Sequence, residues 1–154
     1  TLSQGIDESV NFDDIAVRGL RAIVEVATRE HRVDSTFTGS FGRMRAEDAT
    51  ALAMIISELV QNAVEHGFVD SGAPGAESGA GQIVVAPSRP RGRLLVEVDD
   101  NGRGLPADFD LETSTHLGLS IVRTLVESEL NGQLTLGPGL SGRGTCVSLD
   151  LPHP

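Results

Sequence analysis

Apolar residues recur along the chain with two periods, and these periods predict alternating helices and strands. Helical spacing predicts helices over residues 11–30, 46–66 and 117–130. Strict alternation predicts strands over residues 33–38, 82–87, 93–100, 133–136 and 145–151. In the first helix, the buried stripe is expected to comprise Ile15, Ala16, Leu20, Ile23, Val24 and Ala27. The order of elements predicts a single α/β domain, a two-layer sandwich with helices on one face of a sheet.

The second helix has a row of polar residues beside its apolar face. A step of 100° per residue brings the core-facing residues together, and these are Leu52, Ile55, Ile56, Leu59, Val60 and Ala63. Glu58, Asn62 and His66 lie four residues apart at the margin of this face, whereas Glu65 points to solvent. A half-buried amide without a partner costs roughly 1–3 kcal/mol, so Asn62 should bind something. From this helix alone, a ligand and ordinary backbone hydrogen bonds are equally good explanations.

The strand over residues 93–100 ends in a carboxylate and two glycines. Alternation places Leu94, Val96, Val98 and Asp100 on one face of the sheet. If that face is the core, Asp100 is a carboxylate at the rim of an apolar wall, able to accept a hydrogen bond from an exocyclic amine such as that of adenine. Gly102 and Gly104 then allow the backbone to approach a ligand closely. The alternative is an Asn-Gly hairpin turn, but the following segment lacks strand alternation and contains Pro106.

Two further glycine sites could contribute to a binding site. Gly118 opens the third helix, whose free N–H groups could bind an anion. Gly144 and Thr145 begin the last strand, where Thr145 could donate its hydroxyl. Each feature is weak alone, because glycine often precedes a helix or strand.

Composition excludes several classes of protein. The net charge of -10 argues against direct binding of nucleic acid. All basic residues are arginines, so mechanisms that need a P-loop lysine or a Schiff-base lysine are impossible. The single cysteine, Cys146, excludes an internal disulfide and fits a reducing, cytoplasmic compartment, where we expect a small buried strand residue and not a catalytic thiol. No apolar run is long enough to span a membrane.

Four segments together resemble a known superfamily. In order, they are ELVQNAVEHG, DDNGRGLP, HLGLSIV and GRGTCVSLDLP, which resemble the N box and the three glycine boxes of the GHKL ATPases. This group includes gyrase, heat-shock chaperones, histidine kinases and mismatch-repair ATPases. Within it, the chain looks like the catalytic domain of a bacterial sensor histidine kinase with HRVKN-type dimerisation helices. It further resembles soluble actinobacterial kinases paired with ANTAR-type response regulators.

The resemblance implies a Bergerat-type fold, a mixed and mostly antiparallel sheet with helices on one face, and it implies ATP and Mg²⁺ as ligands. Asn62 would hold Mg²⁺, and Glu58 would lie beside the γ-phosphate and help to accept a proton. His66 would contact the phosphate side, and Asp100 would bind the adenine amine. The remaining implied contacts are Gly102 and Gly104 at the adenine wall, Leu105 in the lid, Gly118 and Leu119 at the phosphates, and Thr145 at the adenine.

The chain departs from the family pattern at two positions. Glu65 stands where many histidine kinases have lysine, and His116 replaces the first glycine of a pair. Arg103 or Arg143 could supply the missing positive charge. The residues from His31 to Val33 match the first letters of the HRVKN phosphoacceptor motif. Asp34 and the residues after it do not continue the helix that this motif needs, so the phosphoacceptor is expected outside this chain.

The resemblance predicts a catalytic domain over residues 11–154, preceded by a linker or the end of a dimerisation region over residues 1–10. Its partners would be an upstream dimerisation and phosphoacceptor domain and a response regulator, within a homodimeric full-length protein. Two alternatives are an anti-sigma-factor serine kinase of the same fold and an interaction module that has lost its nucleotide.

Overall fold

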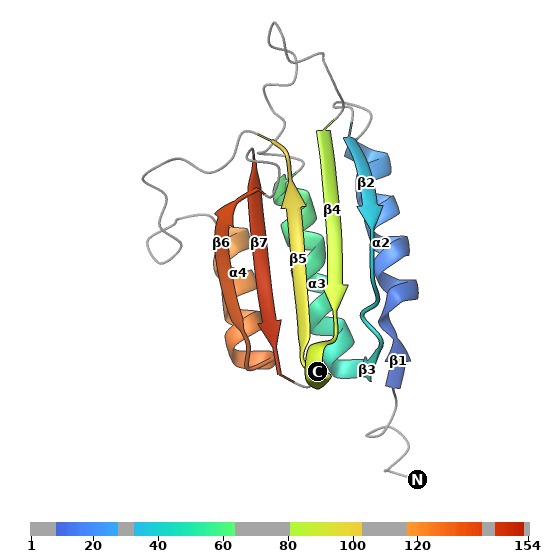
Figure 1. Ribbon diagram of the computed structural model, residues 1–154, viewed down its shortest axis with the longest axis vertical. Helices are drawn as coiled ribbons and strands as arrows, with labels where there is room; N and C mark the ends of the chain where they lie inside the picture. Colours follow the sequence, from blue (N-terminus) through green and yellow to red (C-terminus); the bar gives the residue numbers. More distant parts are fainter. Residues whose placement is uncertain (1–8, 28–32, 64–80, 103–116, 140–143, 153–154) are drawn as a thin grey trace, which may run out of the picture.

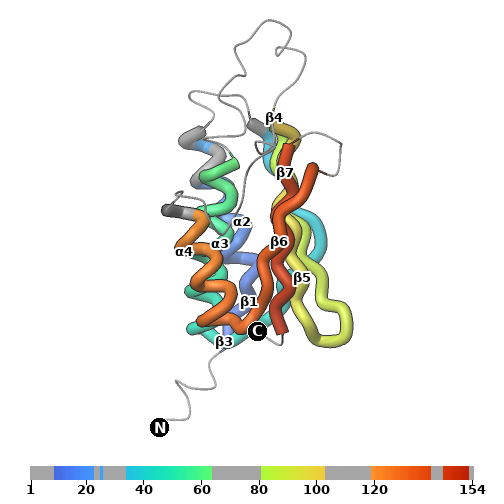
Figure 2. The backbone as a smooth tube through the Cα atoms, turned by 90° about the vertical axis from the view of Figure 1, so that its left-hand side faces the viewer, coloured from blue at the N-terminus to red at the C-terminus, as the bar shows by residue number. Residues whose placement is uncertain are grey.

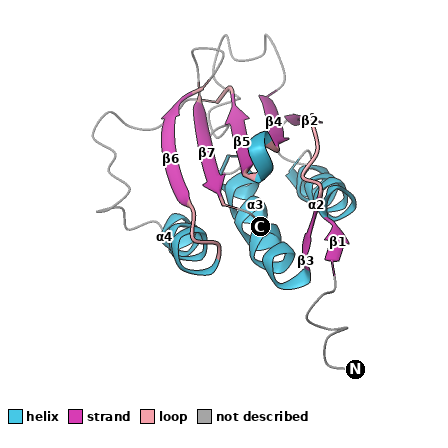
Figure 3. Cartoon of the chain, turned by 60° about the horizontal axis from the view of Figure 1, so that its bottom comes forward, coloured by secondary structure: helices cyan, strands magenta, loops and turns pink. Residues whose placement is uncertain are grey.

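The computed structural model describes residues 9–27, 33–63, 81–102, 117–139 and 144–152. In these ranges the elements are β1 (Ser9–Asn11), α2 (Phe12–Ala27), β2 (Val33–Phe37), β3 (Arg43–Arg45), α3 (Ala46–Asn62), β4 (Gly81–Ser88), the short helix η3 (Pro90–Gly92), β5 (Leu94–Asp100), α4 (Leu117–Thr124), η4 (Leu125–Glu129), β6 (Gln133–Pro138) and β7 (Thr145–Leu151). They form two layers, with helices α2, α3 and α4 side by side on one face of a sheet (Figures 1, 2 and 3).

The main sheet has five strands in the order β2-β4-β5-β7-β6. β2 is parallel to β4, and every other neighbouring pair is antiparallel. This confirms the predicted mixed, mostly antiparallel sheet. Burial alternates along β5 as predicted, with Leu94, Val96, Val98 and Asp100 buried and the residues between them half-buried.

The core lies between the sheet and the helices. The face of α3 predicted from its spacing is confirmed, because Leu52, Ile55, Ile56, Leu59, Val60 and Ala63 are all buried. Aliphatic residues from the strands complete the core, among them Ile83, Val85, Leu149 and Leu151. Burial of these side chains, worth roughly 25 cal/mol per Å² of apolar surface, is the main force holding α3 against the sheet.

One residue of the predicted stripe in the first helix was assigned wrongly. Ile15 is 40% exposed and lies away from the core, while Phe12, Ala16 and Leu20 are buried. The prediction was wrong because the helix begins at Phe12, whose fully buried ring sets which face of the helix turns inward. Around the helix axis, Ala16 lies to one side of Phe12, and Leu20 lies on that same side. Ile15 lies about 60° to the other side of Phe12, away from these buried residues.

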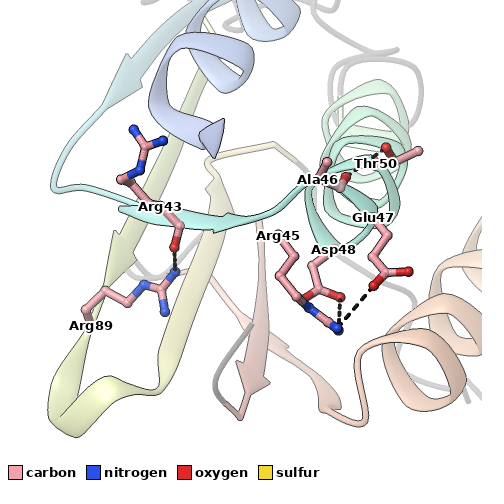
Figure 4. Close-up of polar contacts among 7 residues, drawn as sticks. All are labelled: Arg43, Arg45, Ala46, Glu47, Asp48, Thr50 and Arg89. Atoms are coloured by element: carbon pink, nitrogen blue, oxygen red, sulfur yellow. Dashed lines mark hydrogen bonds and ion pairs between the residues drawn. The ribbon is translucent and has the colours of Figure 1, made fainter. Parts of the chain in front are cut away.

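A small two-stranded sheet was not predicted. β1 pairs antiparallel with β3, so that Ser9 lies opposite Arg45 and Asn11 opposite Arg43. Strands of three residues are too short to show a period. β3 leads directly into α3, where Arg45 binds Glu47 and Asp48 at 3.1 and 3.2 Å, and Arg89 donates to the carbonyl of Arg43 at 3.0 Å (Figure 4).

The third predicted helix, over residues 117–130, is present in two parts. α4 ends at Thr124 and continues as η4, a π-helical turn in which the N–H of Leu130 donates to the carbonyl of Leu125 at 3.2 Å. Asn131 then has a positive φ of 52°, the left-handed conformation that ends many helices. None of the helices in the described ranges has both the length and the apolar character that crossing a membrane requires.

Candidate functional site

The described parts of the four segments singled out in the sequence begin or end at the same end of the molecule (Figure 1). α3 runs along the sheet towards the end at which β5 finishes, and β7 begins at the same end (Figure 1). α3 also packs against β5 and α4. The fold therefore brings the end of α3, the end of β5 and the start of β7 to the same end of the molecule, with α4 adjoining α3.

Asp100 is the best-defined polar residue of this site. It is 7% exposed, and its Oδ1 accepts hydrogen bonds from the N–H groups of Gly102 at 2.9 Å and Thr145 at 3.3 Å. Burial raises the pKa of Asp100, the two backbone hydrogen bonds partly offset this, and the nearby charge of Asp99 adds to it. Among the described residues nothing donates to Oδ2, so the carboxylate is held by one oxygen and can accept a ligand hydrogen bond with the other.

Gly144 makes this arrangement possible, although the sequence pattern predicts only that it precedes a strand. A Cβ atom at Gly144 would lie 2.0 Å from the backbone oxygen of Asp100 and 2.6 Å from its Oδ1. Its φ of +80° is also in the region that favours glycine. No side chain therefore fits there, and this close approach brings the N–H of Thr145 to the carboxylate. In the sequence, only the Gly-Thr pair before the last strand marks this position. Its contact with Asp100 becomes visible only in the three-dimensional structure.

The alternative of a hairpin turn at Asn101 and Gly102 is excluded. β5 is already paired along both edges, with β4 through Ile83 opposite Asp100 and with β7 through Cys146 opposite Asp99. A strand formed by the residues after Gly102 would have no free edge of β5 to pair with. The glycine turn instead places the N–H of Gly102 on Asp100.

Asn62 lies half-buried at the last position of α3, as the helix geometry predicted. Its Nδ2 atom is buried and, in the part of the chain that the structure describes, has no hydrogen-bond partner. Turning the amide by 180° places the acceptor Oδ1 at the same point, so the side chain can offer either a donor or an acceptor. Glu58, one turn earlier, is also half-buried. Within the described residues, no backbone hydrogen bond accounts for the Nδ2 atom of Asn62.

The other predicted site residues are placed less completely. Gly118 and Leu119 lie in the first turn of α4, and the Leu119 side chain is 8% exposed in the core. Thr145 is half-buried and bound to Asp100 through its N–H. Several predicted residues lie outside the described residues, namely His66, Gly104, Leu105, His31, Glu65, Arg103, His116 and Arg143.

Cys146 is a buried strand residue, as expected. Its Sγ lies 3.7 Å from Oε2 of Glu97 and 4.0 Å from Oγ of Ser148. Burial raises the pKa of the thiol, and the neighbouring charges of Glu97 and Asp99 raise it further, whereas a hydrogen bond with Ser148 lowers it. A neutral thiol is a poor nucleophile, which argues against a catalytic role.

The opposite face of the sheet carries a shallow groove of about 390 Å³, lined by residues that include Leu95, Glu97, Thr135 and Ser148. It contains none of the residues predicted to bind a ligand, and it is separated from them by the sheet itself. The groove is therefore distinct from the site around Asp100.

Comparison with known proteins identifies the family. The family of histidine kinase-, DNA gyrase B- and HSP90-like ATPases matches residues 47–154, more than half of the chain. The sensor histidine kinase PdtaS of Mycolicibacterium smegmatis is 43% identical over 151 residues, which cover 98% of this chain and 29% of that protein. PdtaS of Mycobacterium tuberculosis is 41% identical over the same shares of the two chains. The chain thus spans less than a third of the length of these relatives.

Solved structures show the same architecture. The histidine kinase domain of a blue-light-activated histidine kinase from Erythrobacter litoralis has a TM-score of 0.78 and 29% identity, over 93% of this chain and 61% of that one. The catalytic domain of the histidine kinase ThkA has a TM-score of 0.72 and 23% identity, over 95% of this chain and 96% of that one. This chain therefore belongs to the family of histidine kinase-, DNA gyrase B- and HSP90-like ATPases, with the fold of a histidine kinase catalytic domain.

Proposed function

We propose that this chain binds ATP with Mg²⁺ as the catalytic domain of a sensor histidine kinase and transfers the γ-phosphoryl group to a histidine outside the chain. The observation that supports this most strongly is Asp100, a buried carboxylate held by one oxygen with the other oxygen available. The relatives of this chain are named sensor histidine kinases, which favours a histidine kinase over a serine kinase of the same fold.

Asp100 would bind the adenine base. The exocyclic amine of adenine is a hydrogen-bond donor, and an ionised carboxylate in a poorly solvated site is a strong acceptor for it. Guanine has a carbonyl oxygen at the corresponding position, which the carboxylate would repel. Gly102 and Gly104 would bring the backbone against the base, Leu105 would belong to the lid, and the hydroxyl of Thr145 would support the base.

Asn62 and Glu58 would act at the phosphates. When bound, Mg²⁺ neutralises charge on the phosphate oxygens during transfer. The residues present fit such an ion, because the Nδ2 atom of Asn62 is buried without a partner in the described residues, and a turn of the amide places Oδ1 at the same point as a ligand. In those same ranges no three His, Cys, Asp or Glu side chains lie together to hold a metal, so phosphate oxygens would supply other ligands. Glu58 would accept the proton lost by the attacking histidine.

The start of α4 would complete the phosphate side of the site. Free N–H groups in the first turn of a helix, here at Gly118 and Leu119, favour an anion. Leu119 would contribute through its backbone, because its side chain is in the core. His66 is proposed as a further contact on this side.

The proposed partners lie outside this chain. This chain spans 29% of PdtaS, which leaves room for further domains in a protein of that length. The full protein is proposed to contain an upstream dimerisation and phosphoacceptor domain, to act as a homodimer in the cytoplasm, and to signal to an ANTAR-type response regulator. The catalytic domain is proposed to occupy residues 11–154, with residues 1–10 leading from the upstream region. β1 begins at Ser9, so the last residues of that leading segment already pair with β3.

Phosphorylation of the full-length protein by ATP carrying a radiolabelled γ-phosphoryl group tests the proposal. Asn62→Ala should lower the rate of phosphorylation at least roughly 100-fold, because one metal contact is lost at the transferring group. Its free energy of unfolding without nucleotide should not fall, because the Nδ2 atom that is removed makes no hydrogen bond within the described residues.

Gln61→Ala is the matched control. Gln61 is exposed, precedes Asn62 on the same helix and loses the same kind of group. Its phosphorylation rate should stay within about twofold of the parent, a difference below 0.5 kcal/mol in barrier height. Equal rates for Asn62→Ala and the parent would show that Asn62 has no part in phosphoryl transfer.

A further inference from the structure

The end of β5 is closed by a side chain and not by its own backbone. The N–H of Asn101 donates to the carbonyl of Gln82 at 3.2 Å, as in a continuing antiparallel ladder. A regular ladder would return the N–H of Gln82 to the backbone carbonyl of Asn101. Here the N–H of Gln82 instead donates to Oδ1 of the Asn101 side chain at 2.8 Å.

This substitution lets the chain turn immediately after Asp100. Because the side chain of Asn101 accepts the last ladder bond, its backbone carbonyl is released from the sheet. The next residue, Gly102, can then turn its N–H back to Oδ1 of Asp100 at 2.9 Å. That bond joins a side chain to the N–H two residues on, the pattern of an Asx turn.

The two edges of β5 hold Asp100 in different ways. On the β7 side, the N–H of Thr145 binds the carboxylate itself. On the β4 side, Asp100 lies opposite Ile83, and the hydrogen bonds at the end of that ladder are those between Asn101 and Gln82. Loss of the Asn101 side chain would remove one of the two hydrogen bonds at the β4 edge. The bond from Thr145 at the β7 edge would remain.

We propose that Asn101 is a positioning residue for nucleotide selection: by closing the β4–β5 ladder with its side chain, it fixes the carboxylate of Asp100 for the adenine amine. Asn101 itself need not touch the nucleotide. This inference rests on the proposed binding of ATP, and it adds a residue that sequence reasoning treated only as part of a turn.

Competition between ATP and GTP for the purified chain, measured by calorimetry, tests this role. In Asn101→Ala the preference for ATP over GTP should fall at least about tenfold, because a misplaced carboxylate no longer distinguishes an amine from a carbonyl. Asn101→Asp retains Oδ1 and should recover most of the preference. A preference in Asn101→Ala within about twofold of the parent would overturn the proposal.

Asn11→Ala is the matched control, because Oδ1 of Asn11 also accepts a backbone N–H, that of Asp13 at 3.1 Å. β1, which ends at Asn11, lies at the opposite end of the molecule from the end of β5 (Figure 1). This variant should keep the parent's preference for ATP. Equal loss of preference in Asn11→Ala and Asn101→Ala would show a general structural effect and would also overturn the proposal.

Two results separate this inference from the function on which it rests. If the parent chain binds neither nucleotide, the proposed function fails first. If the parent prefers ATP, amide exchange tests the geometry without any variant: the Gln82 amide proton should exchange as slowly as amides inside β4, and exchange at the rate of an exposed loop would contradict its hydrogen bond.

Discussion

At the scale of single residues, the site depends on one carboxylate kept in an unfavourable environment. Asp100 is 7% exposed, and its pKa is raised chiefly by burial. Because its pKa is higher in the folded chain than in the unfolded chain, ionising it costs folding free energy. That cost is absent at low pH and develops as the pH rises through the raised pKa. The protein thus loses stability at neutral pH to keep a charged acceptor in the site.

Asp100→Asn should separate binding from stability. The amide oxygen can still accept from Gly102 and Thr145, but an NH₂ group would then face the adenine amine. We expect ATP affinity to fall roughly 10- to 150-fold, the equivalent of a 1.5–3 kcal/mol hydrogen bond to a charged group. Without nucleotide the variant should be more stable than the parent at neutral pH, by a margin that shrinks as the pH falls through the raised pKa towards the ordinary value of an aspartate.

Calorimetric titration with ATP and thermal unfolding over a pH series measure the two effects. Unchanged ATP affinity would place the adenine elsewhere. A stability advantage that grew on acidification would contradict the direction given for the pKa of Asp100.

Gly144→Ala should damage the same site through packing. The new Cβ would meet the backbone and carboxylate of Asp100, and alanine disfavours the φ of +80°. We expect a loss of roughly 2–5 kcal/mol in the free energy of unfolding, from overpacking and from the left-handed conformation. Gly137→Ala on the neighbouring strand is the control, because its Cβ would have nothing within 4 Å. Chemical denaturation of both variants gives the comparison, and equal stabilities would refute the close contact.

At the scale of elements, the start of α2 is tied to the segment that leads into α3. Asp13 accepts a hydrogen bond from the N–H of Phe41 and another from the hydroxyl of Ser40, both at 2.7 Å. The ring of Phe41 is fully buried and meets that of Phe12 edge-on, with centroids 4.8 Å apart. These contacts fix the position at which α3 begins, and α3 bears Glu58 and Asn62.

Asp13→Ala should therefore cost roughly 1–3 kcal/mol of folding free energy, since it leaves a part-buried N–H without its acceptor. Asp14→Ala serves as the control. Asp14 is exposed, and its substitution removes the same charge from the same helical turn. That control should change stability by only about 0.3–1 kcal/mol, the usual effect of one charge at a helix N-terminus. Urea unfolding of both variants measures the difference, and equal losses would mean that the contacts of Asp13 contribute nothing.

Sequence patterns predicted the elements that have a period and missed those that have none. The buried face of α3 and the alternation of β5 follow from side-chain spacing and were confirmed. β1 and β3 each have three residues, and their pairing joins Val10 to Met44, a relation between distant segments that no local pattern contains. The inward face of α2 was misjudged at Ile15 for a related reason, because Phe12 takes its position from a contact with Phe41.

At the scale of the whole molecule, the order of strands brings together segments that are far apart in the sequence. β5 and β7 are neighbours in the sheet, so Asp100 meets Thr145, 45 positions later in the sequence, and the adjacent Gly144. The resemblance of four motifs predicted that these segments form one site, and the family and fold were confirmed. The hydrogen bonds around Asp100, the unpartnered amide of Asn62 and the role of Asn101 depend on three-dimensional contacts that spacing alone does not show.

Binding of ATP with Mg²⁺ to the purified chain tests the central claim most directly, and isothermal titration calorimetry measures it. We predict one site per chain, with affinity that falls when Mg²⁺ is removed. At about ten times the dissociation constant, ATP should add roughly 1.4 kcal/mol to stability, which corresponds to a rise of about 3–6 °C in Tm. No heat of binding and no change in Tm at millimolar ATP would contradict the account and leave a domain that keeps the fold without its nucleotide.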